Sequence, residues 1–163
     1  MSAIMLKIVV EDQDMREIYE PHVRKHNDEI ANISHPNAGF DLFIPETHTI
    51  PATIQTYKIN HKLKAEMTMN NEPTGFFLMP RSSFSGTPLM LANHVGVVDS
   101  GYRGDLIAAV RNLGESTFVA ERGIRLMQIC HPTLKPFRVE IVGSVNDLSS
   151  TARGAGGFGS TGR

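Results

Sequence analysis

Short runs of apolar or alternating residues recur along this chain, with turn-forming residues between them. A half-buried strand alternates apolar and polar side chains, whereas an amphipathic helix repeats its apolar positions every three or four residues. Nine runs fit the strand pattern, at residues 6–10, 40–44, 53–59, 63–69, 76–79, 106–110, 117–120, 124–130 and 137–142. This spacing predicts an all-β fold, a distorted jelly roll or β-sandwich barrel with at most one or two short helices and a flexible C-terminal tail.

The stretch from residue 11 to residue 37 does not follow the strand pattern. Its apolar residues from 15 to 19 have helical spacing, but Pro21 has no backbone N–H and should stop the pattern. We therefore expect a polar excursion that carries at most one short helix. Three histidines in this stretch have no familiar metal-site spacing and are expected to be solvated: His22, His26 and His35.

The length of 163 residues is sufficient for one domain with its own core. Within it we expect an N-terminal strand and polar excursion (1–37), a β core (38–145) and a Gly-rich C-terminal lid (146–163). The 16 Lys and Arg nearly balance the 17 Asp and Glu, so no global field favours a nucleic-acid polymer or an anionic membrane. Any anionic ligand must therefore be bound by local groups.

The single cysteine, Cys130, lies in an apolar run, which excludes an intramolecular disulfide and suits a reducing compartment. We expect an inert buried thiol. No apolar run is long enough to span a membrane or to serve as a secretory signal. The sequence predicts an intracellular protein, cytoplasmic or nuclear, with no evident targeting segment.

The last eleven residues combine five of the 14 glycines with groups that bind nucleotides. Glycines let backbone N–H groups approach an anion, Arg153 offers a bidentate fork, Ser160 and Thr161 add hydroxyls, and Phe158 offers a flat face to a base. Such a segment has too little apolar surface to order itself. It is either a flexible tail without function or a segment that a phosphorylated nucleotide orders.

Two further segments offer groups for phosphate chemistry. Arg81, Ser82 and Ser83 follow a predicted strand and precede a possible helical turn, so they form either an anion site or an ordinary serine N-cap. Asp41 lies inside an apolar strand and needs a partner, either a cation or, more often in proteins, an arginine.

The strand at 124–130 carries two polar residues, Arg125 and Gln128. From alternation we expect Arg125 and Met127 to share one face of the strand and Gln128 to lie on the other.

A Gly-rich hairpin follows at residues 93–105. Asp99 could accept a proton from water in a hydrolysis, and Tyr102 could pack against a sugar and exclude one with an extra hydroxyl. Alternatively, Asp99 stabilises the turn and Tyr102 is a core residue at the sandwich edge. Arg103 and Asp105 are expected to serve turn and surface roles.

Taken in order, the segments at 38–42, 80–83, 96–104, 123–129 and 153–162 resemble the five motifs of the homotrimeric dUTPases. The most specific parts are Gly-Val-Val-Asp-x-x-Tyr-Arg-Gly at 96–104 and Arg-Gly-x-Gly-Gly-Phe-Gly-Ser-Thr-Gly at 153–162. The resemblance implies hydrolysis of dUTP to dUMP and pyrophosphate by water attack on the α-phosphorus. It implies a role in keeping uracil out of DNA and in supplying dUMP for thymidylate synthesis.

The resemblance also implies residue roles. Asp99 would be the general base, and Mg²⁺ would bind across the triphosphate, touching Asp41 through water. The uracil and deoxyribose would contact Asn93, Gly96, Val97, Val98, Tyr102, Ile107, Phe158 and Gly159. The phosphates would contact Arg81, Ser82, Ser83, Gln128, Arg153, Ser160 and Thr161. Each site of the homotrimer would be shared, with the tail of one chain closing over a cleft between two others.

The chain departs from the family pattern at three places. Ser83 stands where the second motif often has Gly, Ile124 stands where the fourth motif often has Asp, and residues 11–37 are longer than the family usually needs. One alternative is a dCTP deaminase-like enzyme, but the strand after the hairpin lacks the glutamate that such enzymes use. The other is a catalytically silent trimer that senses nucleotides or regulates partners; Asp99 and the intact tail motif argue against it.

Overall fold

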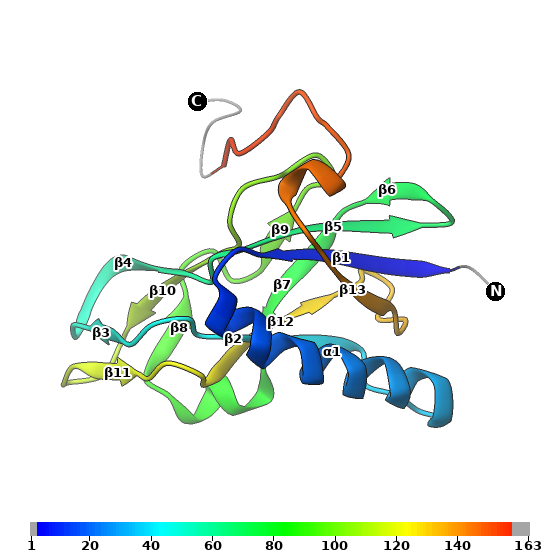
Figure 1. Cartoon of the computed structure of the whole chain (residues 1–163). Coiled ribbons are helices and arrows are strands. Elements are labelled where there is room, and N and C mark those ends of the chain that lie inside the picture. Colours follow the sequence, from blue (N-terminus) through cyan, green and yellow to red (C-terminus); the bar gives the residue numbers. More distant parts are fainter. Residues whose placement is uncertain (1–2, 158–163) are drawn as a thin grey trace.

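The computed structural model describes residues 3–157, which form short strands in four sheets, one α-helix and two 3₁₀ turns (Figure 1). One sheet pairs β13 (Arg138–Val142), β1 (Ile4–Val10), β5 (Leu63–Met69) and β6 (Glu72–Thr74) in that order. A second pairs β2 (Gly39–Phe43), β12 (Arg125–Cys130), β7 (Phe76–Pro80) and β9 (Gly96–Val98). Smaller sheets pair β4 (Thr53–Asn60), β10 (Ile107–Asn112) and β8 (Leu89–Leu91), and β11 (Phe118–Ala120) with β3 (His48–Ile50).

All nine runs identified in the sequence form strands, so the expectation of an all-β, jelly-roll-like fold is confirmed. Alternation explains the core, because Leu6 and Ile8 of β1 and Leu42 of β2 point inward and have no measurable exposure. The strands that the sequence did not predict, which include β3, β6 and β8, are each three residues long. In the described residues, no helix is both long and apolar enough to cross a membrane.

The helix α1 (Gln13–Asn32) is the main departure from the expected fold. It runs for 20 residues and continues through Pro21, so the expectation of a short helix that stops there is wrong. Asp12 caps its start by accepting a hydrogen bond from the Met15 N–H at 2.9 Å. The buried face keeps helical spacing beyond the proline, at Met15, Tyr19, Val23 and His26.

Contacts with two sheet edges explain why the helix persists. The Tyr19 hydroxyl accepts a hydrogen bond from the Phe43 N–H of β2 at 2.9 Å. Asn27 bonds both backbone groups of Val139 in β13, donating to its carbonyl at 2.8 Å and accepting from its N–H at 2.9 Å. Both β2 and β13 are edge strands with unpaired backbone groups. Helix α1 therefore covers the open edges of two sheets (Figure 1). These contacts stabilise the helix beyond what its local helix propensity provides.

Replacing Pro21 with alanine should stabilise the protein by about 1–2 kcal/mol. Pro21 is exposed, and it interrupts the backbone hydrogen bonds of α1, whereas alanine restores a donor without losing a buried contact. Urea unfolding monitored by circular dichroism measures the change. Pro36→Ala, in the loop after α1, is the control and should be neutral or destabilising; an equal gain at both positions would contradict the helix argument.

Arg103 is the second correction, because it is buried rather than exposed at a turn. Its side chain is 7% exposed and forms an ion pair with Glu66 of β5, itself 4% exposed, at 2.9 Å. Arg103 also donates to the Ser100 carbonyl and to the carbonyl and hydroxyl of Ser149 at 2.8–2.9 Å. This network connects the hairpin at residues 93–105 to β5 and to the segment that leads into the tail. Asp105, by contrast, is only half-buried and pairs with Lys64, in line with the expected surface role.

His61 is fully buried, and its burial sets a pH dependence of stability. Burial lowers the pKa of this imidazole to about 4, because the charged form loses its hydration, although the Phe43 carbonyl partly offsets this. The folded protein therefore favours neutral His61. Above pH 6.5, which is about the pKa of histidine in the unfolded chain, the imidazole is neutral in both states and its burial costs no stability.

Lowering the pH from 6.5 to 4 should therefore reduce the free energy of unfolding by about 2–4 kcal/mol through His61. Urea titrations at pH steps of half a unit measure the slope. His61→Gln should flatten it, whereas His35→Gln, at an exposed position, should leave it unchanged. The same slope in wild type and His61→Gln would contradict this assignment.

Candidate active site

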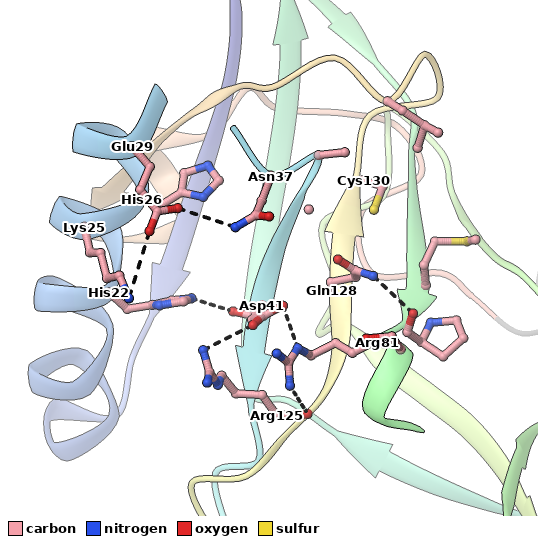
Figure 2. Close-up of a pocket in the computed structure, with 16 residues that line it drawn as sticks. His22, Lys25, His26, Glu29, Asn37, Asp41, Arg81, Arg125, Gln128 and Cys130 are labelled. Carbon is pink, nitrogen blue, oxygen red and sulfur yellow. Dashed lines mark hydrogen bonds and ion pairs between the residues drawn. The ribbon is translucent and has the colours of Figure 1, made fainter. Parts of the chain in front are cut away.

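Two cavities gather most of the candidate residues, and they share no lining residue. The hairpin pocket, about 230 Å³, lies against β9 and the turn after it. The arginine pocket, about 450 Å³, lies between α1 and the sheet of β2, β12 and β7 (Figure 2).

The hairpin pocket brings together Asp99 and nearly all the residues expected around a nucleoside. Its lining includes Asn93, Gly96, Val97, Val98, Asp99, Tyr102, Ile107 and Arg153. The Asp99 side chain is 55% exposed, so its carboxylate is open to a water or a ligand. The tail residues expected to join them, Phe158, Gly159, Ser160 and Thr161, lie outside the described residues.

Close backbone packing shapes this pocket. Gly96 of β9 pairs with Leu78 of β7, and a Cβ at Gly96 would lie 2.9 Å from the Leu78 carbonyl oxygen. Only glycine fits there without moving β7. The Tyr102 hydroxyl donates to the Asp105 carbonyl at 2.7 Å, which holds the ring at the pocket wall while the ring also packs against the core. Tyr102 thus keeps a packing role and still faces the pocket.

The first part of the tail lies on the hairpin of the same chain. The Arg103 N–H donates to the Gly154 carbonyl at 2.7 Å and fixes this segment. From there Arg153 contacts the Asp99 carboxylate through Nη1, and its guanidinium lies 5.9 Å from the centre of the Tyr102 ring. Asp99 therefore has a cationic partner within its own chain.

In the arginine pocket, the partner of Asp41 is a pair of arginines. Arg81 Nε lies 2.8 Å from one carboxylate oxygen of Asp41, and Arg125 Nη1 lies 3.2 Å from the other. Of the two partners considered for Asp41, the structure contains the arginines. Within residues 3–157, no three His, Cys, Asp or Glu side chains form a group that could hold a metal ion.

A hydrogen bond explains the serine at position 83, where the second motif of the family often has glycine. The Ser83 hydroxyl accepts a hydrogen bond from Arg81 Nη1 at 3.2 Å, and the same nitrogen donates to the Arg125 carbonyl at 3.1 Å. Ser82 begins a 3₁₀ turn (Ser82–Gly86) and lines the pocket, whereas Ser83 does not. Ser83 therefore helps to orient Arg81 rather than facing the cavity.

The prediction of which β12 side chains share a face of the strand is wrong, because the strand contains a β-bulge. The pairing with β2 shifts register between Arg125 and Met127, so strict alternation fails at this point. Met127 is buried, whereas Arg125 and Gln128 both line the arginine pocket. Gln128 donates to the Pro80 carbonyl at 3.2 Å.

Two of the three histidines expected to be solvated belong to this pocket instead. His26 is 7% exposed and lies 2.9 Å from the Phe137 carbonyl oxygen, and His22 Nε2 lies 3.1 Å from the carbonyl oxygen of Asp41. Burial lowers the pKa of both imidazoles. The helical spacing of residues 15–26 across Pro21 was the signal that could have placed them; only His35 is exposed.

Cys130 also lines the arginine pocket and is a buried free thiol, as expected. Burial raises the pKa of this thiol, and Asp41 adds to the effect, which keeps the group protonated and unreactive.

Comparisons with known proteins agree with this arrangement. The dUTPase family model matches residues 27–162. The chain is similar to the deoxyuridine 5'-triphosphate nucleotidohydrolase of Clostridioides difficile, 33% identical over 149 residues, which covers 89% of this chain and 99% of that protein. The protein of the same name from Rhizobium etli (strain CIAT 652) is 40% identical over 101 residues, 55% of this chain and 63% of its own length.

Among solved structures, the crystal structure of dUTPase from Streptococcus mutans is similar, with a TM-score of 0.52 and 30% identity. The similarity covers 69% of this chain and 86% of that one. The matched residues include both pockets except for most of the α1 wall, because His22, Lys25 and His26 precede residue 27.

Proposed function

Because this chain belongs to the dUTPase family, we propose that it hydrolyses dUTP to dUMP and pyrophosphate, removing a source of uracil in DNA and supplying dUMP for thymidylate synthesis. The observation that carries the proposal is the grouping of Asp99, Tyr102 and the backbone of β9 around one cavity. The carboxylate, the ring and the narrow backbone slot are the groups that a water, a deoxyribose and a uracil require.

In this proposal Asp99 orients a water molecule and accepts its proton as the water oxygen attacks the α-phosphorus. The bond from the α-phosphorus to the bridging oxygen breaks, and pyrophosphate leaves. Tyr102 lies under the deoxyribose, where a 2′-hydroxyl would clash with the ring. Asn93 and the backbone of Gly96–Val98, with Ile107 on the return strand, bind the uracil edge.

Arg81, Ser82, Gln128 and Arg153 bind the phosphates, and Ser83 supports Arg81. Arg153 contacts the Asp99 carboxylate, so substrate phosphates would compete for its guanidinium and release the carboxylate. Phosphoryl chemistry of this kind depends on positioning and on charge neutralisation, so no covalent nucleophile is required.

Use of Mg²⁺ is general in the dUTPase family, and we propose that such an ion binds here together with the substrate. Asp41 is a single carboxylate whose oxygens already accept from two arginines, so the ion would be held mainly by substrate phosphates and water. When bound, Mg²⁺ would neutralise phosphate charge.

A trimer is typical of the family, and we propose that this chain forms one with shared sites. In a single chain the residues proposed to bind the nucleoside line the hairpin pocket, whereas those proposed to bind the phosphates, except Arg153, line the arginine pocket or lie beside it. Joining the hairpin pocket of one copy to the arginine pocket of another would complete the site, with the tail as the lid.

Pyrophosphate release from dUTP, dCTP, dTTP and UTP, each with Mg²⁺ and with EDTA, tests the function. We expect rapid Mg²⁺-dependent release from dUTP alone. Binding of dUTP without release would favour the silent nucleotide sensor, and ammonia release from dCTP would favour a deaminase.

Deleting residues 153–163 should lower kcat/KM for dUTP by about 10- to 100-fold, because Arg153 and the closing segment are lost. The core should stay folded, since the removed residues add no buried apolar side chain among those described. Steady-state kinetics and thermal melting separate the two effects. An unchanged rate would show that the tail is not a lid.

A further inference from the structure

Helix α1 forms one wall of the arginine pocket. Figure 2 shows Lys25, Glu29 and His22 on this wall, with Asp41 and the two arginines on the sheet side of the pocket. The family match begins at residue 27, so Lys25 belongs to a part of the wall that the family motifs do not account for.

This wall is held in place. The Tyr19 hydroxyl bonds the Phe43 N–H at 2.9 Å, His22 lies 3.1 Å from the Asp41 carbonyl oxygen, and Asn27 makes two bonds to Val139. The His22 ring also packs against Phe40, with the centroids 4.7 Å apart. The backbone at residue 25, between these anchors, therefore has a fixed position relative to Asp41.

Charge makes Lys25 important to this pocket. The charged residues of its lining are Lys25, Arg81 and Arg125 against Glu29 and Asp41. Without Lys25 the cations and carboxylates are equal in number, and both arginines already pair with Asp41. Lys25 is thus the residue that makes the pocket net positive, as binding of a polyphosphate requires.

Lys25 is also available to a ligand. Its side chain is 77% exposed, and its ammonium lies 3.9 Å from a Glu29 carboxylate oxygen, a long and exposed ion pair that contributes little. A lysine has a flexible four-carbon stem, so the ammonium can move from Glu29 to a phosphate oxygen without moving the helix.

We propose that Lys25 is a phosphate-binding residue that lies outside the five motifs, and that it binds the pyrophosphate part of dUTP. The proposal rests on the proposed function. The α-phosphorus must lie near the water held by Asp99 in the hairpin pocket, so the part of the substrate that can extend into the arginine pocket is the pyrophosphate. Lys25 then contacts the substrate and the pyrophosphate product, but not dUMP.

The test compares Lys25→Gln with wild type, using dUTP turnover and product inhibition. We expect the KM for dUTP and the inhibition constant of pyrophosphate to rise about three- to tenfold, with little change in kcat. Inhibition by dUMP should not change. The dependence of pyrophosphate binding on salt should become less steep, because one cationic contact is lost.

Arg24→Gln is the matched control, since it removes the same charge from the adjacent, exposed position of α1, and Arg24 does not line the pocket. It should behave as wild type, and Lys25→Arg should restore wild-type constants. Equal constants for Lys25→Gln and Arg24→Gln would overturn the assignment, as would an equal loss of dUMP affinity. If wild type does not hydrolyse dUTP, the proposed function fails, and calorimetric binding of pyrophosphate to wild type and Lys25→Gln still decides the role of Lys25.

Discussion

Replacing Asp99 with asparagine should lower kcat for dUTP by about 10²- to 10⁴-fold, the range that a general base contributes. Asparagine keeps the shape of the side chain in the hairpin pocket but cannot accept the proton of the attacking water. Because the lining of the pocket is otherwise intact, binding of a non-hydrolysable imido analogue of dUTP should persist. Single-turnover kinetics and equilibrium binding measure the two effects separately.

The charge change itself needs a control, because Asp99 also contacts Arg153. Asp28→Asn removes one carboxylate from an exposed position of α1 that lines neither pocket, and it should leave kcat unchanged. Normal turnover by Asp99→Asn would show that another group activates the water. Loss of binding together with turnover would assign Asp99 to substrate binding instead.

Replacing Arg103 with leucine should reduce the free energy of unfolding by about 3–5 kcal/mol, the usual effect of leaving one charge of a buried pair without its partner. Glu66 would remain 4% exposed without the guanidinium, and the Ser100 carbonyl would lose a donor. Urea unfolding measures the loss. Activity should also fall, because Arg103 anchors both the hairpin and the segment before the tail.

An exposed ion pair offers the comparison. Lys62 and Glu46 are as close, at 2.7 Å, but about half of each side chain is exposed, so Lys62→Ala should cost far less stability than Arg103→Leu. Replacing Glu66 and Arg103 together with apolar residues should recover part of the stability, since no unpaired charge remains. A loss for Arg103→Leu as small as that for Lys62→Ala would contradict the buried-pair argument.

The hairpin pocket was predictable because its residues are close in sequence. Asn93, Gly96, Asp99 and Tyr102 lie within ten positions, and a turn after β9 brings them to one cavity, to which Leu78 and Arg153 also contribute. The arginine pocket was less predictable. Its motif residues come from β2, from β12 and from the segment after β7, and the bulge before Met127 reverses the face on which Arg125 was expected.

Periodicity in the sequence determined the β architecture, since each of the nine alternating runs can bury an apolar face only as a strand. The tertiary structure decided which segments became partners. Helix α1 persists through Pro21 because the edges of β2 and β13 need hydrogen-bond partners, and Arg103 is buried because Glu66 lies opposite it on β5. These interactions join residues far apart in the chain, so their free energy depends on where the fold places both partners, and the local pattern around either one does not contain it.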